Sequence, residues 1–203
     1  TFASPDRRER EFAVVHISKT LRFAAEMGAR VVVCHSGNVD VPKYSFDLLR
    51  MASHNEQFSE PYEALKLKVQ IARDKKAPRQ IDYLSESLEA LVPVIQETGV
   101  HLALENLPTW EAIPSELESE QLMKRFHSSG IRLWWDIGHA QIRENLGFIN
   151  SSRWVHRLAP HIAGLHIHDV APPGQDHIMP PRGKVDFKAL SDLAKMDMVR
   201  VLE

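Results

Sequence analysis

The sequence predicts an α/β protein with a parallel sheet, forming part of a TIM-type (β/α)8 barrel. Three observations predict this fold class. Short runs of β-branched and apolar residues, typical of strands buried on both faces, alternate with amphipathic helical segments. The units follow one another at intervals of roughly 30 residues, which indicates βαβ connections. Side chains able to bind a metal follow each predicted strand, at the end where barrels carry their active sites.

The composition sets the class of protein. The chain has 203 residues, of which 43% are hydrophobic and 26% charged, so we treat residues 1–203 as a single globular domain. A net charge of -2 provides no basic surface for nucleic acid or an anionic membrane. The one cysteine excludes an internal disulfide, and the sequence has neither a secretory signal pattern nor an apolar run long enough to span a membrane. These features predict a cytoplasmic protein.

Helix starts, helix stops and apolar runs place the elements in order. The first helix is expected to begin at Ser4-Pro5-Asp6, with Ser4 as its N-cap, and to end at Gly28. The predicted strands are residues 31–34, 100–104, 131–135, 162–167 and 199–202. The other predicted helices are residues 83–97, 115–126, 154–158 and 186–195.

One stretch departs from this alternation. Residues 39–80 contain several prolines among charged residues, and we expect a long loop over the active site that carries a helix at residues 61–73. Because a closed barrel needs about 250 residues, and this chain supplies five strands and starts with a helix, we expect about strands 4–8. On this interpretation three N-terminal strand units and a last helix are missing from the sequence.

The ends of the predicted strands supply the candidate site. Glu105, Asp136 and Glu203 end three of them, and the first and fourth end near His35 and His168. Because the carboxyl ends of barrel strands converge, these side chains are expected to meet. Three carboxylates in one site repel each other unless a cation neutralises them. One divalent metal (Mn, Co, Zn or Mg) suits these oxygen and imidazole ligands.

Two alternatives bear on the individual residues. His166 and His168 lie on the same face of the fourth strand, and we assign the ligand role to His168 because it is nearer the carboxyl end. His166 is then a residue that lines the barrel or supports the ligands. A polar residue after a strand is commonly a helix cap or turn former, but capping does not explain ligand-type side chains at every strand end.

Further polar residues, beginning with His35 after the first predicted strand, are candidates for binding substrate. His139 follows Asp136 by three residues and is expected at the site, as a substrate contact or a ligand of a second metal. The loop of residues 175–183 contains Asp176-His177, which could bind a metal or a hydroxyl group. Arg182 in the same loop could bind an anionic group, although this segment also fits a proline-stiffened surface loop.

Together these segments resemble the xylose isomerase-like TIM-barrel superfamily, which includes sugar phosphate isomerases and epimerases and an apurinic endonuclease family. The similar segments are residues 34–37, 104–106, 135–139, 166–169, 176–177, 183–187 and 201–203. By this resemblance Glu105, Asp136, His168 and Glu203 match the metal quartet. The two glutamates would also move protons on the carbon next to a carbonyl, through a metal-stabilised enediolate. His35, His139 and His177 match several additional zinc-binding histidines of the endonuclease branch.

The resemblance implies a divalent-metal isomerase or epimerase of a small sugar, keto sugar or polyol derivative. A dehydratase of such compounds, a zinc-dependent phosphodiesterase of the apurinic endonuclease type and a non-catalytic sugar-binding barrel stay open. Three features oppose the endonuclease: the slightly acidic charge, Leu107-Pro108-Thr109 after Asn106, and the adjacency of Asp176 and His177. We therefore expect a carbohydrate substrate, no nucleic acid and no membrane partner, and leave open a homo-oligomer.

Overall fold

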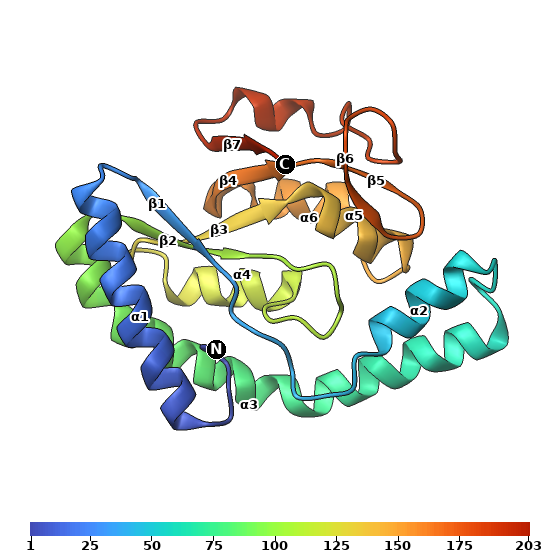
Figure 1. The fold of residues 1–203 in the computed structure, drawn as a ribbon, viewed down its shortest axis with the longest axis horizontal. Helices are drawn as coiled ribbons and strands as arrows, with labels where there is room; N and C mark the ends of the chain where they lie inside the picture. The colour runs from blue at the N-terminus through green and yellow to red at the C-terminus, as the bar shows by residue number, and fades with distance from the viewer.

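The computed structural model describes residues 1–203, and its centre is a five-stranded parallel sheet with the strand order β1-β2-β3-β4-β7 (Figure 1). The strands of this sheet are β1 (Val31–Cys34), β2 (His101–Glu105), β3 (Ile131–Asp136), β4 (Ile162–Ile167) and β7 (Val199–Leu202). The helices are α1 (Arg7–Glu26), α2 (Tyr44–Ser53), α3 (Glu60–Thr98), α4 (Glu116–Arg125), α5 (Ile137–Asn145) and α6 (Ser151–Leu158). Two short 3₁₀ helices, η1 (Ala159–His161) and η2 (Ser191–Lys195), and an antiparallel hairpin of β5 (Asp169–Ala171) and β6 (Gln175–Ile178) complete the fold.

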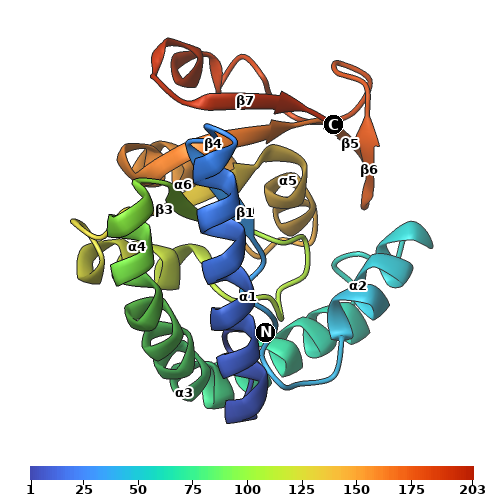
Figure 2. The same cartoon turned by 60° about the vertical axis from the view of Figure 1, so that its left-hand side comes forward.

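The strands confirm the predicted parallel sheet. All five predicted strands form, and each neighbouring pair in the sheet is parallel. The predicted start of α4 is also confirmed, because Ser115 and Glu118 form a capping box. The sheet therefore directs all its carboxyl ends the same way, and in both views α2 and the β5–β6 hairpin lie beyond those ends (Figures 1 and 2).

The two faces of the sheet differ. A core cluster of 31 buried residues joins one face to the helices, with Leu88 of α3, Leu122 of α4 and Trp135 of β3 among them. Trp134 points to the opposite face, as the alternation of a strand requires. There it lies over Gly164 of β4, where a Cβ atom would come within 2.3 Å of the indole ring. The absence of a side chain at Gly164 thus makes room for the indole on the face that carries the candidate site.

The long segment before β2 corrects one expectation. Instead of a loop at residues 39–80 that holds a separate short helix, α2 is followed by one continuous helix of 39 residues, which runs through Pro78 and bends along its length (Figure 1). Proline costs a backbone hydrogen bond inside a helix, but Pro78 lies on the exposed side. Buried residues on both sides of it, Ala77 and Gln80, keep the helix against the rest of the protein.

Smaller differences occur at other elements. Asp6 caps α1, because its carboxylate accepts a hydrogen bond from the Arg8 amide, whereas the Ser4 hydroxyl accepts one from the Asp6 amide. The predicted helix at residues 186–195 is reduced to η2. Neither α5 nor the β5–β6 hairpin was expected. Residues 175–183 were expected to form a loop, whereas Pro172-Pro173-Gly174 forms the turn that joins β5 to β6.

A second, smaller hydrophobic cluster joins α2 and the first half of α3 to α5 and β5. It includes Leu48, Tyr62, Ile142, Leu146 and Val170, all buried. The Tyr62 hydroxyl donates a hydrogen bond of 3.1 Å to the Leu146 carbonyl, just beyond the last turn of α5. None of the helices combines the length and the apolar character that a membrane span requires.

The continuity of α3 leads to a prediction about Pro78, one of two exposed prolines in its interior. Pro78→Ala is expected to raise the free energy of unfolding by about 1–3 kcal/mol, because the restored helix hydrogen bond outweighs the gain in unfolded-chain entropy. Pro61→Ala is the matched control and is expected to give no such gain, because Pro61 lies in the first turn, where its missing amide would be unpaired in any case. Urea denaturation measures both, and a destabilised Pro78→Ala variant would mean that the helix is interrupted there.

Candidate metal centre

The carboxyl ends of four strands meet around one imidazole. His166 of β4 places its Nδ1 atom 2.9 Å from Glu105 Oε1, 3.5 Å from Asp136 Oδ2 and 3.6 Å from Glu203 Oε2. The strand pairing explains this meeting, because Asp136 lies opposite His166 in the β3–β4 register and His166 lies opposite Val201 in the β4–β7 register. Glu105, Asp136 and His166 place three donor atoms within 4.8 Å of one another, close enough to hold a cation.

Asp136 has the most constrained carboxylate of the site. It is fully buried and caps α5, since Oδ1 accepts a hydrogen bond of 2.7 Å from the His139 amide. Burial alone would raise the pKa of Asp136, but hydrogen bonds from His166 and His168 hold it well below its usual range. The side chain is therefore an anion at neutral pH, and the positive end of α5 stabilises it further.

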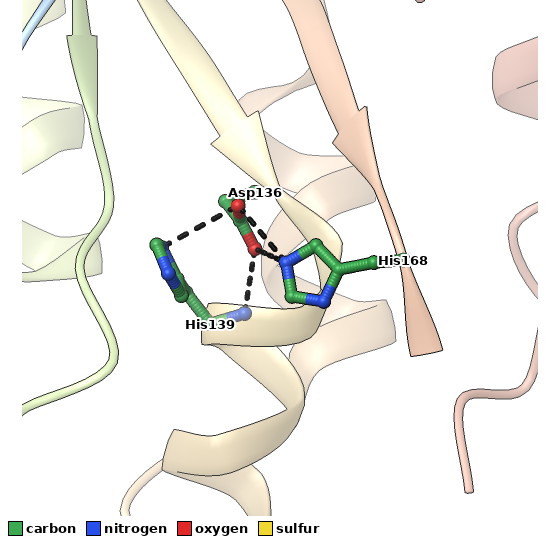
Figure 3. A group of neighbouring side chains, drawn as sticks. All are labelled: Asp136, His139 and His168. Atoms are coloured by element: carbon green, nitrogen blue, oxygen red, sulfur yellow. Dashed lines mark hydrogen bonds and ion pairs between the residues drawn. The ribbon is translucent and has the colours of Figure 1, made fainter. Parts of the chain in front are cut away.

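His168 supports Asp136 with one ring nitrogen and is held by the other. The ring stacks parallel to that of His177 at 4.3 Å, and the His177 amide donates a 3.0 Å hydrogen bond to Nδ1. Because a backbone N–H only donates, Nδ1 is the acceptor in this hydrogen bond and carries no proton. Against the effect of burial, the hydrogen bond to Asp136 raises the pKa of His168. The proton is on Nε2, which donates to Asp136 Oδ1 at 3.0 Å (Figure 3). Both nitrogens of His168 are thus engaged in hydrogen bonds.

A glycine makes the approach of His168 possible. The imidazole lies against the first turn of α5 (Figure 3), where a Cβ atom on Gly138 would be 2.0 Å from Cε1 of the ring. No side chain could occupy position 138 without moving this ring. The residue is therefore required by the packing of His168 and not by its own backbone conformation.

His139 flanks Asp136 on the other side (Figure 3). Its Nδ1 lies 2.9 Å from the Asn106 carbonyl, to which it donates, and 3.5 Å from Asp136 Oδ2. Burial lowers the pKa of His139, so the ring is neutral at neutral pH. With the proton on Nδ1, the lone pair of Nε2 is available to a substrate or a cation.

Glu105 is held between two imidazoles. Its Oε2 lies 2.9 Å from Nε2 of His35, which is largely exposed, and its Oε1 contacts His166. Burial would raise the pKa of Glu105, but hydrogen bonds from His35 and His166 bring it below its ordinary value. Glu105 is thus a buried, ionised carboxylate, and its partner His35 lies between it and the solvent.

The β5–β6 hairpin brings His177 to the same place. Its Nε2 lies 3.3 Å from Glu203 Oε2 and its Nδ1 lies 3.2 Å from Asp176. His168, His177 and Glu203 form a second group with donor atoms within 4.8 Å, and Asp136, His139 and His168 form a third. Arg182 is exposed in the following turn, and no hydrogen bond or ion pair joins its side chain to these groups.

The structure thus brings seven of the eight predicted site residues into contact. They are Glu105, Asp136, Glu203, His35, His139, His168 and His177. It also adds two residues to which the sequence assigned no direct contact, His166 at the centre of the carboxylates and Asn106, whose amide holds the backbone of Asp136. A prediction of strand register would have identified His166, because the register decides which histidine lies opposite Asp136.

Comparisons with known proteins agree on the fold. A family model described as "Xylose isomerase-like TIM barrel" matches residues 1–197. An uncharacterized protein of Methanocaldococcus jannaschii, MJ1614, is 25% identical over 127 residues, which are 62% of this chain and 47% of that protein.

Several solved structures are similar to this chain over nearly its whole length. A D-tagatose 3-epimerase-like protein superposes with a TM-score of 0.69 at 19% identity, over 99% of this chain and 66% of its own. The 3-keto-D-glucoside 4-epimerase YcjR of E. coli gives a TM-score of 0.67 at 17% identity, over 100% and 66%. A Thermus thermophilus protein, TTHB071, soaked with ZnCl2, gives 0.60 at 23% identity, over 97% and 64%. At such identities these matches show the fold alone.

The position of His166 predicts a pH dependence of stability in the metal-free protein. Hydrogen bonding to Asp136, together with Glu105 and against the effect of burial, raises the pKa of His166 from 6.5 to about 9. Its contribution to stability is therefore complete below pH 6.5 and is lost as the pH rises through about 9. We expect the difference in unfolding free energy between wild type and His166→Gln to shrink over this window, measured by urea denaturation; a constant difference would contradict the charged state of His166.

Proposed function

We propose that this chain, which belongs to the xylose isomerase-like TIM-barrel family, is an isomerase or epimerase of a small sugar or polyol derivative. In this proposal one divalent cation binds to Glu105, Asp136, His166 and Glu203. The observation that carries the proposal is the gathering of these three carboxylates around Nδ1 of a single imidazole. Without a cation or a proton at this point, the carboxylates would repel one another.

The donor set fits a metal. Three carboxylate oxygens and one imidazole nitrogen suit Mn, Co, Zn or Mg. His166 takes the ligand role that was expected of His168, since both nitrogens of His168 are engaged and its Nε2 proton orients Asp136. When bound, the cation would polarise the substrate carbonyl and stabilise the negative charge that develops on its oxygen.

The two glutamates would carry the protons. Glu105 and Glu203 come from β2 and the end of β7, which are separated in the sheet by β3 and β4, so they flank the site from opposite sides. One removes a proton from the carbon next to the carbonyl, and the other returns a proton, which gives epimerisation or isomerisation. Glu105 is ionised at neutral pH because His35 and His166 lower its pKa, so it has the protonation state of a base.

The nature of the similar structures supports a carbohydrate substrate. Several are named as sugar epimerases, including a D-psicose 3-epimerase with D-tagatose and an L-ribulose 3-epimerase. The neutral imidazole of His139, with its free Nε2, and the exposed His35 could bind hydroxyl groups. Arg182 and His177 stay candidates for substrate contacts.

A zinc phosphodiesterase is the second candidate. The observation in its favour is that three overlapping groups of donor atoms, and not one, lie within 4.8 Å. Elemental analysis of the purified protein separates the two: one ion per chain supports the isomerase, and three zinc ions support the phosphodiesterase. Activity on keto sugars or inositol derivatives, against hydrolysis of DNA with abasic sites, provides the second comparison.

The choice between the two histidines is tested by metal affinity. His166→Gln is expected to abolish binding of Mn²⁺ because it removes a ligand, whereas His168→Gln is expected to weaken it by only about 10- to 100-fold through Asp136. Isothermal titration calorimetry measures both, with exposed His54→Gln as the control. The reverse order would return the ligand role to His168.

The role of Glu105 is tested by turnover. Glu105→Gln keeps the size of the side chain and removes the base, so we expect kcat to fall by at least about 100-fold. The circular dichroism spectrum should stay that of the wild type. Exposed Glu97→Gln is the matched control and is expected to retain full activity. Full activity of Glu105→Gln would refute the proposed mechanism.

A further inference from the structure

We infer that Asn106 is the positioning residue of this centre. Its side-chain amide fixes the backbone of Asp136, and its main-chain carbonyl fixes the ring of His139. The inference rests on the proposed metal site, because Asp136 and His139 need fixed positions only if they act at that site. Asn106 follows the last residue of β2 and is buried, with 8% of its surface exposed.

The amide of Asn106 pairs with both backbone groups of Asp136. Oδ1 accepts a 2.8 Å hydrogen bond from the Asp136 amide, and Nδ2 donates a 3.0 Å hydrogen bond to the Asp136 carbonyl. Parallel pairing of β2 with β3 ends at Glu105 opposite Trp134, so the side chain continues the ladder beyond the strand. An amide is the side-chain group that both donates and accepts in this way.

These two hydrogen bonds determine where the Asp136 carboxylate points. The amide and carbonyl lie on either side of its Cα atom, so fixing both leaves only the side-chain torsions free. The carboxylate then accepts from the His139 amide at 2.7 Å and from His168 at 3.0 Å. Loss of the Asn106 side-chain amide would remove both hydrogen bonds that hold the backbone of Asp136, and with it the position of the carboxylate.

The main chain of Asn106 acts on the neighbouring imidazole. Its carbonyl oxygen lies 2.9 Å from His139 Nδ1 and accepts the ring proton, which leaves Nε2 unprotonated. The residue before Asn106 is Glu105, itself a proposed ligand. One residue therefore connects Glu105, Asp136 and His139, and no other side chain forms a hydrogen bond with the backbone of Asp136.

A purely structural role is the competing explanation, and the chain contains a matched control for it. Gln80 is also a buried amide that bridges backbone groups, since it donates to the Ala3 and Asn38 carbonyls and accepts from the Asp40 amide. None of these partners is a proposed ligand. Gln80→Leu should therefore lower stability without changing the metal centre.

The experiment compares wild type, Asn106→Leu, Asn106→Asp and Gln80→Leu, each titrated with Co²⁺. We expect both Asn106 variants to bind Co²⁺ about 10- to 100-fold more weakly and to change the visible absorption of the bound ion, which reports ligand geometry. Asn106→Asp keeps the acceptor for the Asp136 amide but places an oxygen against its carbonyl, so it carries the test if Asn106→Leu does not fold. Gln80→Leu is expected to retain the affinity and spectrum of the wild type.

Hydrogen exchange separates this inference from the proposed function. The Asp136 amide should be protected in wild type and in Gln80→Leu and should exchange at least about 10-fold faster in the Asn106 variants. Unchanged protection, or unchanged Co²⁺ affinity and spectrum in both Asn106 variants, would overturn the inference. If wild type itself bound no Co²⁺, the proposed metal site would be wrong, and the exchange rate alone would decide whether Asn106 holds Asp136.

Discussion

The constraint on which this structure depends is the mutual repulsion of three carboxylates at the carboxyl end of one sheet. Glu105, Asp136 and Glu203 all lie within 3.6 Å of His166 Nδ1. Like charges at such distances are tolerated only where donors or cations surround them. The protein supplies donors from every side, including two further imidazoles and the first turn of α5. The carboxylate acceptors raise the pKa of His166, which favours a positive charge between them.

Two aromatic rings near this centre pack directly against the backbone of a neighbouring element, at positions where the residue is glycine. Gly138 allows the His168 ring to lie on the backbone of α5, and Gly164 allows the Trp134 ring to lie across β4. The indole then meets the His166 ring edge to face at 5.1 Å, so the central imidazole has a rigid aromatic neighbour. Gly138 and Gly164 are thus positions where a neighbouring ring occupies the space of a side chain.

Much of the fold could be predicted from the sequence because its signals are local. The β-branched run at β1 and the serine cap of α4 each depend on a few neighbouring residues, and both are present as expected. Pro78 misled the prediction because a proline signals a break, whereas tertiary packing of Ala77 and Gln80 keeps α3 continuous. The helix α5 was not predicted, since Asp136 was interpreted only as a candidate ligand, and the structure shows that its carboxylate caps this helix.

The candidate site also has features that could be predicted from the sequence and features that could not. Convergence of Glu105, Asp136 and Glu203 could be predicted, because parallel strands place their carboxyl ends together. The position of His166 among all three carboxylates could not, because it depends on the register of β4 against β3, which shifts between Leu133 and Trp134. The role of Asn106 depends on a contact between two strand ends and has no signature in a single sequence.

The short helix α5 shows what the second hydrophobic cluster does for the site. A helix of nine residues is too short to persist in water by itself. Here the Asp136 carboxylate holds its first turn, and the Tyr62 hydroxyl holds the carbonyl just past its last. Secured at both termini, α5 cannot fray toward the solvent. The direction of the His139 imidazole is thereby maintained in part by a tyrosine on α3, at the opposite end of the helix that bears it.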